Sequence, residues 1–363
     1  MFIALSIIII YCILLIAFFM HPQFGRRPCG DRLERIKRSS NYRKGAFQNI
    51  SPTPVMAEGT NFFQVFREFL FTKNRKPKQA VPIVKTDLKN LDPGKDILIW
   101  FGHSSCFIQI DGKKILVDPV LNSNVSPVPF TMRAFKGADP FTTDDIPEID
   151  YLFITHDHWD HLDYKTLRKL KPKIKKIICG LGTASHLERW GFDTKIISEA
   201  DWYERIILDE GFEAHTVPAR HFSGRGMKRN QTLWTSFAFI TPSMKFFFGS
   251  DGGYDTHFAE AGKTFNGFDL AILENGQYNK NWKFIHMSPD EVLKAAQDLR
   301  ATRVLPVHSG KFSLSVHTWD EPLKKITELN KATMQTVITP VIGEPVNLKD
   351  FSQPFSKWWE EIH

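Results

Sequence analysis

The sequence predicts an α/β protein in which two β-sheets pack face to face with helices outside, preceded by an N-terminal transmembrane helix. Three observations support this fold class: hairpin signals open the body, strands and helices then alternate, and the pattern repeats in the second half. The chain has 363 residues, of which 42% are hydrophobic and 24% charged. This composition is ordinary for a globular protein with a sizeable core.

Residues 1–20 form an uncharged apolar run. A helix of about 20 residues is about 30 Å long, which matches the hydrocarbon core of a bilayer. No basic residue precedes the run, and the bulky His21 and Pro22 follow it. We therefore expect an uncleaved anchor; a signal peptide and a buried helix are the alternatives.

Basic residues follow the apolar run: Arg26, Arg27, Arg32, Arg35, Lys37, Arg38, Arg43 and Lys44. Because positive flanks stay in the cytoplasm, they predict a single-pass protein of a bacterial inner membrane with its catalytic body in the cytoplasm. The net charge of +7 suits contact with anionic lipid. No zinc-finger spacing or RNA-binding signature supports a nucleic-acid partner. Four scattered cysteines argue against a disulfide framework.

Changes in composition divide the chain into four parts. Residues 1–20 are the anchor, 21–95 a basic linker and approach segment, 96–345 the compact domain and 346–363 a C-terminal tail. Within the approach segment, apolar residues at helical spacing predict an amphipathic helix over 61–72. This helix could pack on the body or lie in the membrane interface.

Within the compact domain, alternation and turn signals place the elements in order. Strands are expected at 97–100, 106–110, 114–117, 151–155, 176–179, 212–217, 236–240, 245–248, 270–273 and 304–307. Helices are expected at 164–170, 184–190, 289–299 and 321–330. Asp111-Gly112 is a hairpin signal between two of the strands. Residues 119–149 contain five prolines and predict a long irregular loop.

Three His and three Asp residues crowd into the stretch from His156 to Asp163, directly after an apolar strand. A loop at a strand end can aim such side chains at one point, and imidazole with carboxylate is ligand chemistry for zinc or a similar divalent ion. The alternative is a solvated polar turn before a helix. The cluster predicts a metal site.

Further candidate ligands stand where later strands run out. They are His221 after 212–217, Asp251 after 245–248 and His308 after 304–307. Taken alone, each could be a core His bonded to a carbonyl or an Asp capping a glycine turn. Together with the first cluster, they predict a larger site to which several strands contribute.

The pattern His156-x-His158-x-Asp160-His161, followed by His221, Asp251 and His308, resembles the metallo-β-lactamase superfamily. The resemblance implies an αββα sandwich. Within the superfamily, the chain is most similar to the N-acylphosphatidylethanolamine-hydrolysing phospholipase D branch, over roughly residues 40–335. The matching stretches include 100–105, 116–119, 250–254, 268–271, 286–291 and 308–312.

The resemblance implies two zinc ions per chain with these ligands: His156, His158 and His221 for one, Asp160, His161 and His308 for the other, and Asp251 as the bridge. Asp160 and Asp251 would be the catalytic carboxylates. Asp118 would orient a ligand His or pack beneath the site. His103 and His286 are candidates for phosphate contact or proton delivery, with a structural role as the alternative. Asp157, Trp159 and the stretch 274–278 depart from the family pattern and could alter the substrate pocket.

The resemblance also implies a substrate. The expected activity is hydrolysis of N-acylphosphatidylethanolamine-like phospholipids to phosphatidic acid and N-acylethanolamine at the membrane. The alternatives are a lactonase or small-molecule phosphoester hydrolase like the ascorbate-phosphate lactonase branch, and a non-catalytic membrane-anchored sensor. The tether favours a lipid over a soluble metabolite. A homodimer is compatible with the family, although no feature of the sequence requires one.

Overall fold

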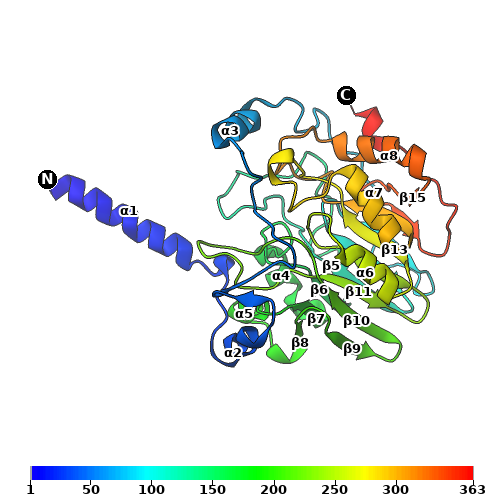
Figure 1. Cartoon of the computed structure of the whole chain (residues 1–363), viewed down its shortest axis with the longest axis horizontal. Coiled ribbons are helices and arrows are strands. Elements are labelled where there is room, and N and C mark those ends of the chain that lie inside the picture. The colour runs from blue at the N-terminus through cyan, green and yellow to red at the C-terminus, as the bar shows by residue number, and fades with distance from the viewer. Residues whose placement is uncertain (1, 363) are drawn as a thin grey trace.

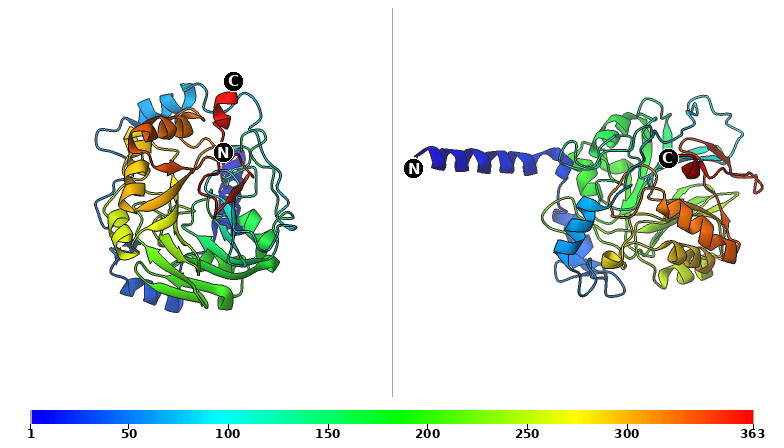
Figure 2. Two further views of the ribbon diagram at one scale, coloured as in Figure 1. Left: turned by 90° about the vertical axis from the view of Figure 1, so that its right-hand side faces the viewer. Right: turned by 90° about the horizontal axis from the view of Figure 1, so that it is seen from above.

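Two seven-stranded sheets pack face to face in the computed structural model, which describes residues 2–362, and helices cover both outer faces (Figures 1 and 2). The first sheet has the order β16 (Pro345–Asn347), β3 (Ile97–Trp100), β4 (Cys106–Ile110), β5 (Lys113–Val117), β6 (Ile149–Ile154), β7 (Ile174–Gly180) and β8 (Ile197–Ala200). The second has the order β15 (Thr336–Val337), β14 (Ala301–Val307), β13 (Phe268–Glu274), β12 (Lys245–Phe248), β11 (Ser236–Ile240), β10 (Phe212–Val217) and β9 (Arg205–Asp209). The predicted sandwich is confirmed.

Each sheet starts with antiparallel strands and continues with parallel ones. In the first sheet, β3, β4 and β5 are antiparallel and β5 to β8 are parallel. In the second, β9 to β12 are antiparallel and β12 to β15 are parallel. The hairpin predicted at Asp111-Gly112 joins β4 to β5, with φ of 49° and 74°, the positive values that a tight two-residue turn needs.

Aromatic side chains fill the space between the sheets. The Phe153 ring of the first sheet lies 5.2, 5.1 and 5.1 Å from the rings of Phe237, Phe239 and Phe248 in the second. All four are fully buried. Edge-on ring contacts of this kind add to the stabilisation from burial alone, so the phenylalanine-rich composition serves the core.

Five helices cover the outer faces. Leu167, Leu170 and Leu187, from α4 (Tyr164–Leu170) and α5 (Ala184–Arg189), pack on the first sheet. The second sheet is covered by α6 (His257–Thr264), α7 (Pro289–Asp298) and α8 (Glu321–Thr333). The expected start of α7 is confirmed, because Ser288 and Glu291 form a capping box there. The described residues also include five short 3₁₀ helices: η1 (Pro22–Phe24), η2 (Lys171–Lys173), η3 (Thr194–Ile196), η4 (Lys280–Trp282) and η5 (Trp358–Glu361).

Two segments that the sequence treats as linker and tail contribute to the body. The first part of 21–95 holds α2 (Gly30–Arg38), β1 (Tyr42–Arg43) and β2 (Ala46–Phe47). Arg32 of α2 pairs with Glu188 and Glu199, and Phe47 is fully buried. In 346–363, β16 continues beyond the expected boundary and pairs with β3, while Trp358 and Trp359 are buried in the core between the sheets. Apolar residues on a short irregular segment carry no periodicity that would reveal this packing.

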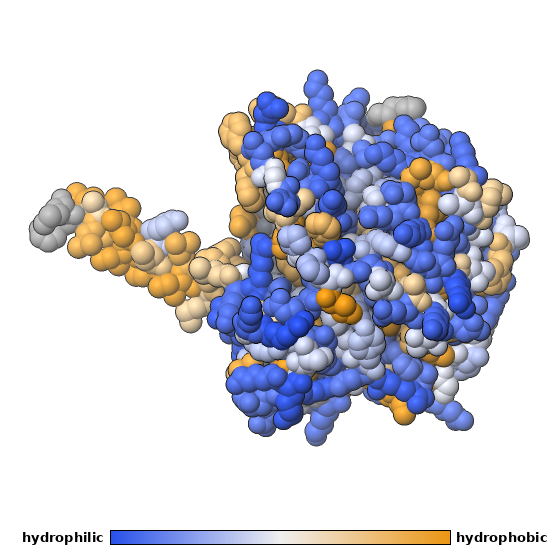
Figure 3. Space-filling view, in the orientation of Figure 1, coloured by the Kyte–Doolittle hydropathy of each residue, from blue (hydrophilic) through white to orange (hydrophobic). Residues whose placement is uncertain are grey.

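The helix α1 (Phe2–Met20) projects away from the body as an isolated apolar rod (Figures 1 and 3). None of residues 3–20 is buried, and its length and composition allow it to cross a membrane. The helix α3 (Phe62–Phe71) also has no buried residue. Five of its phenylalanines are exposed, with exposed fractions from 39% for Phe69 to 76% for Phe63. Of the two arrangements that the sequence allows for this helix, packing of its apolar face in the body is therefore not observed.

Trp358→Ala tests whether the C-terminal segment belongs to the folded body. Removing this fully enclosed ring should lower the free energy of unfolding by about 3–5 kcal/mol. Lys357→Ala, next to it but 53% exposed, should change that free energy by less than about 0.5 kcal/mol. Denaturant unfolding of the full chain in detergent, followed by circular dichroism, measures both. Equal stability of the two variants would show that the segment is a tail.

Candidate metal centre

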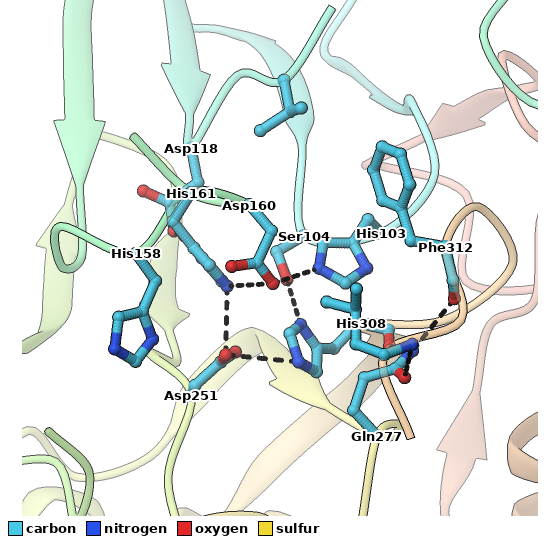
Figure 4. Close-up of polar contacts among 12 residues, drawn as sticks. His103, Ser104, Asp118, His158, Asp160, His161, Asp251, Gln277, His308 and Phe312 are labelled. Atoms are coloured by element: carbon cyan, nitrogen blue, oxygen red, sulfur yellow. Dashed lines mark hydrogen bonds and ion pairs between the residues drawn. The ribbon is translucent and has the colours of Figure 1, made fainter. Parts of the chain in front are cut away.

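Loops at the ends of strands from both sheets meet at one edge of the sandwich (Figure 4). The His156–His161 loop follows β6, and Asp118 follows β5. From the second sheet, His221 follows β10, Asp251 follows β12 and His308 follows β14. Asp163, the last acid of the sequence cluster, instead caps α4 by accepting the Thr166 amide at 2.9 Å. All seven expected ligands are brought together.

Three ring nitrogens form the first half of the centre. His158 Nδ1 lies 3.0 Å from His156 Nε2 and 3.2 Å from His221 Nε2. The ligand-type atoms of these residues lie within 4.8 Å of one another. Such a spacing is what three nitrogens directed at one ion leave between them.

Asp251 joins this triad to the second half of the centre. Its Oδ2 lies 3.1 Å from His161 Nε2, 3.2 Å from His308 Nε2 and 3.9 Å from His156 Nε2. Asp160 Oδ2 lies 3.7 Å from His161 Nε2. A carboxylate oxygen thus stands between His156 of the first group and His161 and His308 of the second, which is the position that a bridging ligand would take. Figure 4 shows its contacts with His161 and His308.

The remote nitrogens of the ligand rings have their own partners. Asp118 Oδ2 lies 2.8 Å from His161 Nδ1 and also accepts a hydrogen bond from the Thr155 hydroxyl at 2.6 Å. His221 Nδ1 donates to the carbonyl of Ile285 at 2.9 Å, and His308 Nδ1 lies 3.1 Å from Ser104 Oγ. Contacts of this kind fix ring orientation and tautomer, so that the other nitrogen faces the centre.

The centre contains several buried carboxylates and, in the described part of the chain, no lysine or arginine that pairs with them. Asp118, Asp160, Asp251 and Glu274 are gathered within it, and among residues 2–362 none of these carboxylates has a Lys or Arg in ion-pair contact. Burial raises the pKa of Asp251. Buried carboxylates in this number, with imidazole nitrogens facing them, fit a pair of divalent cations.

Burial favours the neutral form in four of the five expected histidine ligands. In the fifth, His161, burial is outweighed by the carboxylates of Asp251 and Asp160, which raise the pKa well above its usual value. Burial, with repulsion from neighbouring imidazoles, lowers the pKa of His156, His221 and His308 well below its usual value. Burial likewise lowers the pKa of His158 to about 4. A neutral imidazole offers a lone pair to a metal without first losing a proton.

Backbone geometry at the centre is unusual for residues with a side chain. His103, Asp118 and His308 have φ of 52°, 41° and 65°. The left-handed region costs such residues free energy, so the surrounding contacts must hold them there. His103 and the loop after β14 are tied together by two backbone hydrogen bonds, His103 N to Ser309 O and His308 N to His103 O.

The two additional histidines take different positions. His103 is buried, and its Nε2 lies 2.8 Å from Asp160 Oδ2, behind that carboxylate (Figure 4). Although burial alone would raise the pKa of Asp160, His161 and the bond with His103 lower it well below its usual value. His286 lines the cavity over the centre, and its Nδ1 lies 2.6 Å from Glu274 Oε2. His286 can therefore touch a ligand, while His103 acts through Asp160.

A cavity of about 310 Å³ opens over the centre. Its polar floor comprises His158, Asp160, His221, Asp251, His286 and His308. Its walls are apolar: Val55, Met56, Phe222, Trp282, Ile285 and Leu314. Gln277, from the stretch that departs from the family pattern, also lines it. The approach segment thus contributes directly to the mouth.

Asp157 and Trp159, which stand between the expected ligands, do not line the cavity over the centre. They make contacts outside it. Asp157 faces His186 at 3.1 Å, and Trp159 packs on Arg225, whose Cζ lies 4.0 Å above its ring. Arg225 is buried; it donates two hydrogen bonds to the Gln23 carbonyl, at 3.0 and 2.9 Å. Its Nη1 donates to the carbonyls of Asp157 at 2.8 Å and Leu162 at 2.7 Å. This arginine ties the loop that carries the expected ligands to η1, which follows the N-terminal helix.

The sequence points to Glu274 and Ser104 only as members of the stretches 274–278 and 100–105, and not as individual site residues. Glu274 accepts the Met287 amide at 2.7 Å beside His286, and burial raises its pKa well above the usual value. It ends an apolar strand, so the same strand-end pattern that points to Asp251 could have found it. Ser104 has no comparable signal.

Comparison with known proteins agrees with this geometry. The beta-lactamase superfamily domain matches residues 113–309. An uncharacterized protein of Mycobacterium tuberculosis is 34% identical over 86% of this chain and 85% of its own length. N-acyl-phosphatidylethanolamine-hydrolyzing phospholipase D 1 of Caenorhabditis elegans is 29% identical over 64% of this chain and 69% of its own length. The chain belongs to the metallo-β-lactamase superfamily. It is a hydrolase of that superfamily, with phospholipase D enzymes among its relatives.

Two further matches are partial or structural. Outer membrane protein RomA of Klebsiella pneumoniae is 60% identical over 27% of this chain and 74% of its own length. The solved structure of Igni18, a metallo hydrolase from Ignicoccus hospitalis, has a TM-score of 0.54 and 20% identity, covering 69% of this chain and 97% of that one. The structural match supports the fold.

Asp251→Asn should reduce bound metal from two ions per chain to one or none, because it removes charge from the atom shared by both halves. Metal analysis after dialysis measures the ratio. Asp255→Asn, four residues away and paired with Arg220 outside the centre, should keep both ions. Full metal content in Asp251→Asn would refute the bridging assignment.

Asp118→Asn should leave two ions at saturating metal but weaken binding about 10–100-fold, since it loosens the His161 ring without removing a ligand. Competition with a chelator gives the affinity. An affinity equal to that of the unaltered protein would mean that Asp118 does not position His161.

Proposed function

We propose that this protein is a membrane-anchored dinuclear zinc phosphodiesterase of the phospholipase D type. It hydrolyses N-acylphosphatidylethanolamine-like phospholipids to phosphatidic acid and N-acylethanolamine. The observation that carries the proposal is a two-part His/Asp centre at the floor of a cavity with apolar walls, in a chain that has an apolar N-terminal helix. The phospholipase D relative supports the choice of reaction.

The chain's own residues divide the work in this proposal. His156, His158 and His221 would hold one zinc, Asp160, His161 and His308 the other, and Asp251 would touch both. Zinc ions in such a pair supply a nucleophile from water near neutral pH and neutralise charge on the phosphate. Asp160, kept ionised by His161 and His103, orients the attacking water.

The reaction balances with water as the co-reactant. The water oxygen forms a new bond to phosphorus, and the bond from phosphorus to the ethanolamine oxygen breaks. The leaving oxygen takes a proton and departs as the alcohol. His286 lines the cavity, and its Nδ1 contact with Glu274 fixes the ring, so it is placed to deliver that proton or to bind a phosphate oxygen.

Membrane association is supported by two surfaces. The apolar rod α1 and the exposed apolar residues of α3 lie on the same side of the body in perpendicular views (Figures 1 and 2). An exposed row of large apolar side chains is costly in water and typical of a helix in the bilayer interface. The basic residues after α1 favour an inner membrane with the body in the cytoplasm.

The test uses the full chain loaded with zinc and vesicles of N-acylphosphatidylethanolamine in ¹⁸O-labelled water. Mass spectrometry should find equal amounts of N-acylethanolamine and phosphatidic acid, with the label in the phosphate, because water attacks phosphorus. Asp251→Asn should give neither product. Turnover of soluble lactones or small phosphodiesters alone would overturn the lipid substrate and favour the lactonase-type alternative.

A further inference from the structure

A second cavity of about 240 Å³ lies where α1 meets the body. Its lining includes Phe19 from the end of α1, Phe24 from η1, and the basic residues Arg26, Arg27 and Lys228. It shares no lining residue with the cavity over the metal centre. The two are therefore separate sites, although Asp157 of the metal-binding loop forms part of the wall of this one.

Some of the basic side chains around this cavity have no acidic partner in the described part of the chain. Arg26 pairs with Glu188 at 2.9 Å, and Arg225 is satisfied by carbonyl oxygens. Arg27 and Lys228 are exposed, and within residues 2–362 neither side chain has an ion-pair or hydrogen-bond partner. Asp157, the one carboxylate in the lining, accepts the Gly224 amide at 2.6 Å and faces His186.

One residue of the cavity wall also has an unpaired polar atom. Thr232 lines the cavity with an exposed fraction of 1%, and its Oγ1 has no hydrogen-bond partner among the described residues. Buried hydroxyls are nearly always paired. A ligand oxygen in the cavity would give this hydroxyl its acceptor, at a place where two free cations call for an anion.

The position of the cavity identifies the source of the anion. The apolar run of α1 ends at Met20, and the cavity is built from the residues on either side of that end. Phe19 is 45% exposed and Met227 is 88% exposed, so apolar side chains stand beside the basic ones. If α1 spans a bilayer, the cavity lies at the level of the lipid headgroups.

We propose that this cavity binds the phosphate group of an anionic phospholipid of the surrounding bilayer, as a site distinct from the catalytic centre. Arg27 and Lys228 supply the charge, and Thr232 Oγ1 donates to a phosphate oxygen. Phe19 and Met227 contact the acyl chains. The inference rests on the part of the proposed function that places α1 in a membrane and is independent of the reaction catalysed.

The test counts lipids bound to the full-length protein in detergent by native mass spectrometry, with phosphatidylglycerol and phosphatidylcholine as probes. One phosphatidylglycerol should bind more tightly than phosphatidylcholine. The double variant Arg27→Gln/Lys228→Gln should weaken that binding at least about tenfold, as expected for the loss of two basic residues near a headgroup. The matched control Lys324→Gln/Lys331→Gln changes two exposed lysines of α8 that form no ion pair with any described residue. They lie away from α1 in Figure 1, and their loss should shift the binding less than about twofold.

Thr232→Val separates this site from general charge attraction. The substitution keeps the shape and removes the unpaired hydroxyl. It should therefore weaken phosphatidylglycerol binding and leave the lipid-free protein as stable as before or more so, as judged by its thermal unfolding midpoint. A Thr232→Val variant that is less stable without lipid would mean that the hydroxyl already has a partner and would overturn its assigned role.

Three outcomes would overturn the proposal. The double variant could keep its tight lipid, both double variants could lose it equally, or inorganic phosphate could bind the unaltered protein as tightly as the lipid does. The last result would make free phosphate the ligand. Because bound lipid is counted by mass and not by product, absence of lipid hydrolysis would count against the proposed reaction and leave this site standing.

Discussion

The structure depends on holding buried carboxylates and imidazoles around one oxygen of Asp251. In water these groups would separate and be solvated; here the ends of two sheets bring them within 3–4 Å. The large phenylalanine core holds the two sheets rigidly in this arrangement. The left-handed backbone at His103, Asp118 and His308 adds a conformational free-energy cost. Bound divalent metal would offset the charge that the fold concentrates, and folding and metal binding would then be linked.

The fold could be predicted wherever a strand or helix carries its own period. The strands β10, β11 and β12 and the helix α4 begin and end where apolar alternation and caps place them. The edge strands β8 and β9 lacked that signal because they are short and mixed in character. The helix α6 was not predicted because it contains Gly262, and glycine has a low helix propensity. The structure requires glycine at this position, because a Cβ would come within 2.0 Å of the Asp298 carbonyl oxygen at the end of α7.

The convergence of the expected ligands could be predicted for the same reason: each follows an apolar strand, and strand ends in packed sheets meet. What the sequence could not show were contacts that depend on distant segments. Arg225 is separated from Gln23 by 202 positions, and no local pattern distinguishes it from the exposed Lys228 nearby. The sequence gives His103 and His286 the same candidate roles, and only the structure distinguishes them. His103 lies behind Asp160, whereas His286 lines the cavity.

The Gln23 carbonyl matters for anyone who wishes to obtain the body in soluble form. It is the acceptor for two of Arg225's hydrogen bonds, and it lies three positions beyond the end of the apolar run. Cutting at residue 20 would remove the apolar rod and keep this acceptor. Cutting at residue 25 would remove this acceptor from the Arg225 guanidinium, which lies between Trp159 and Trp190 beside the loop that carries four of the expected ligands. A truncation that removes the apolar helix and one that also disturbs the loop with the expected ligands thus differ by only five residues. A hydropathy profile shows where the apolar helix ends but not which residues the loop needs.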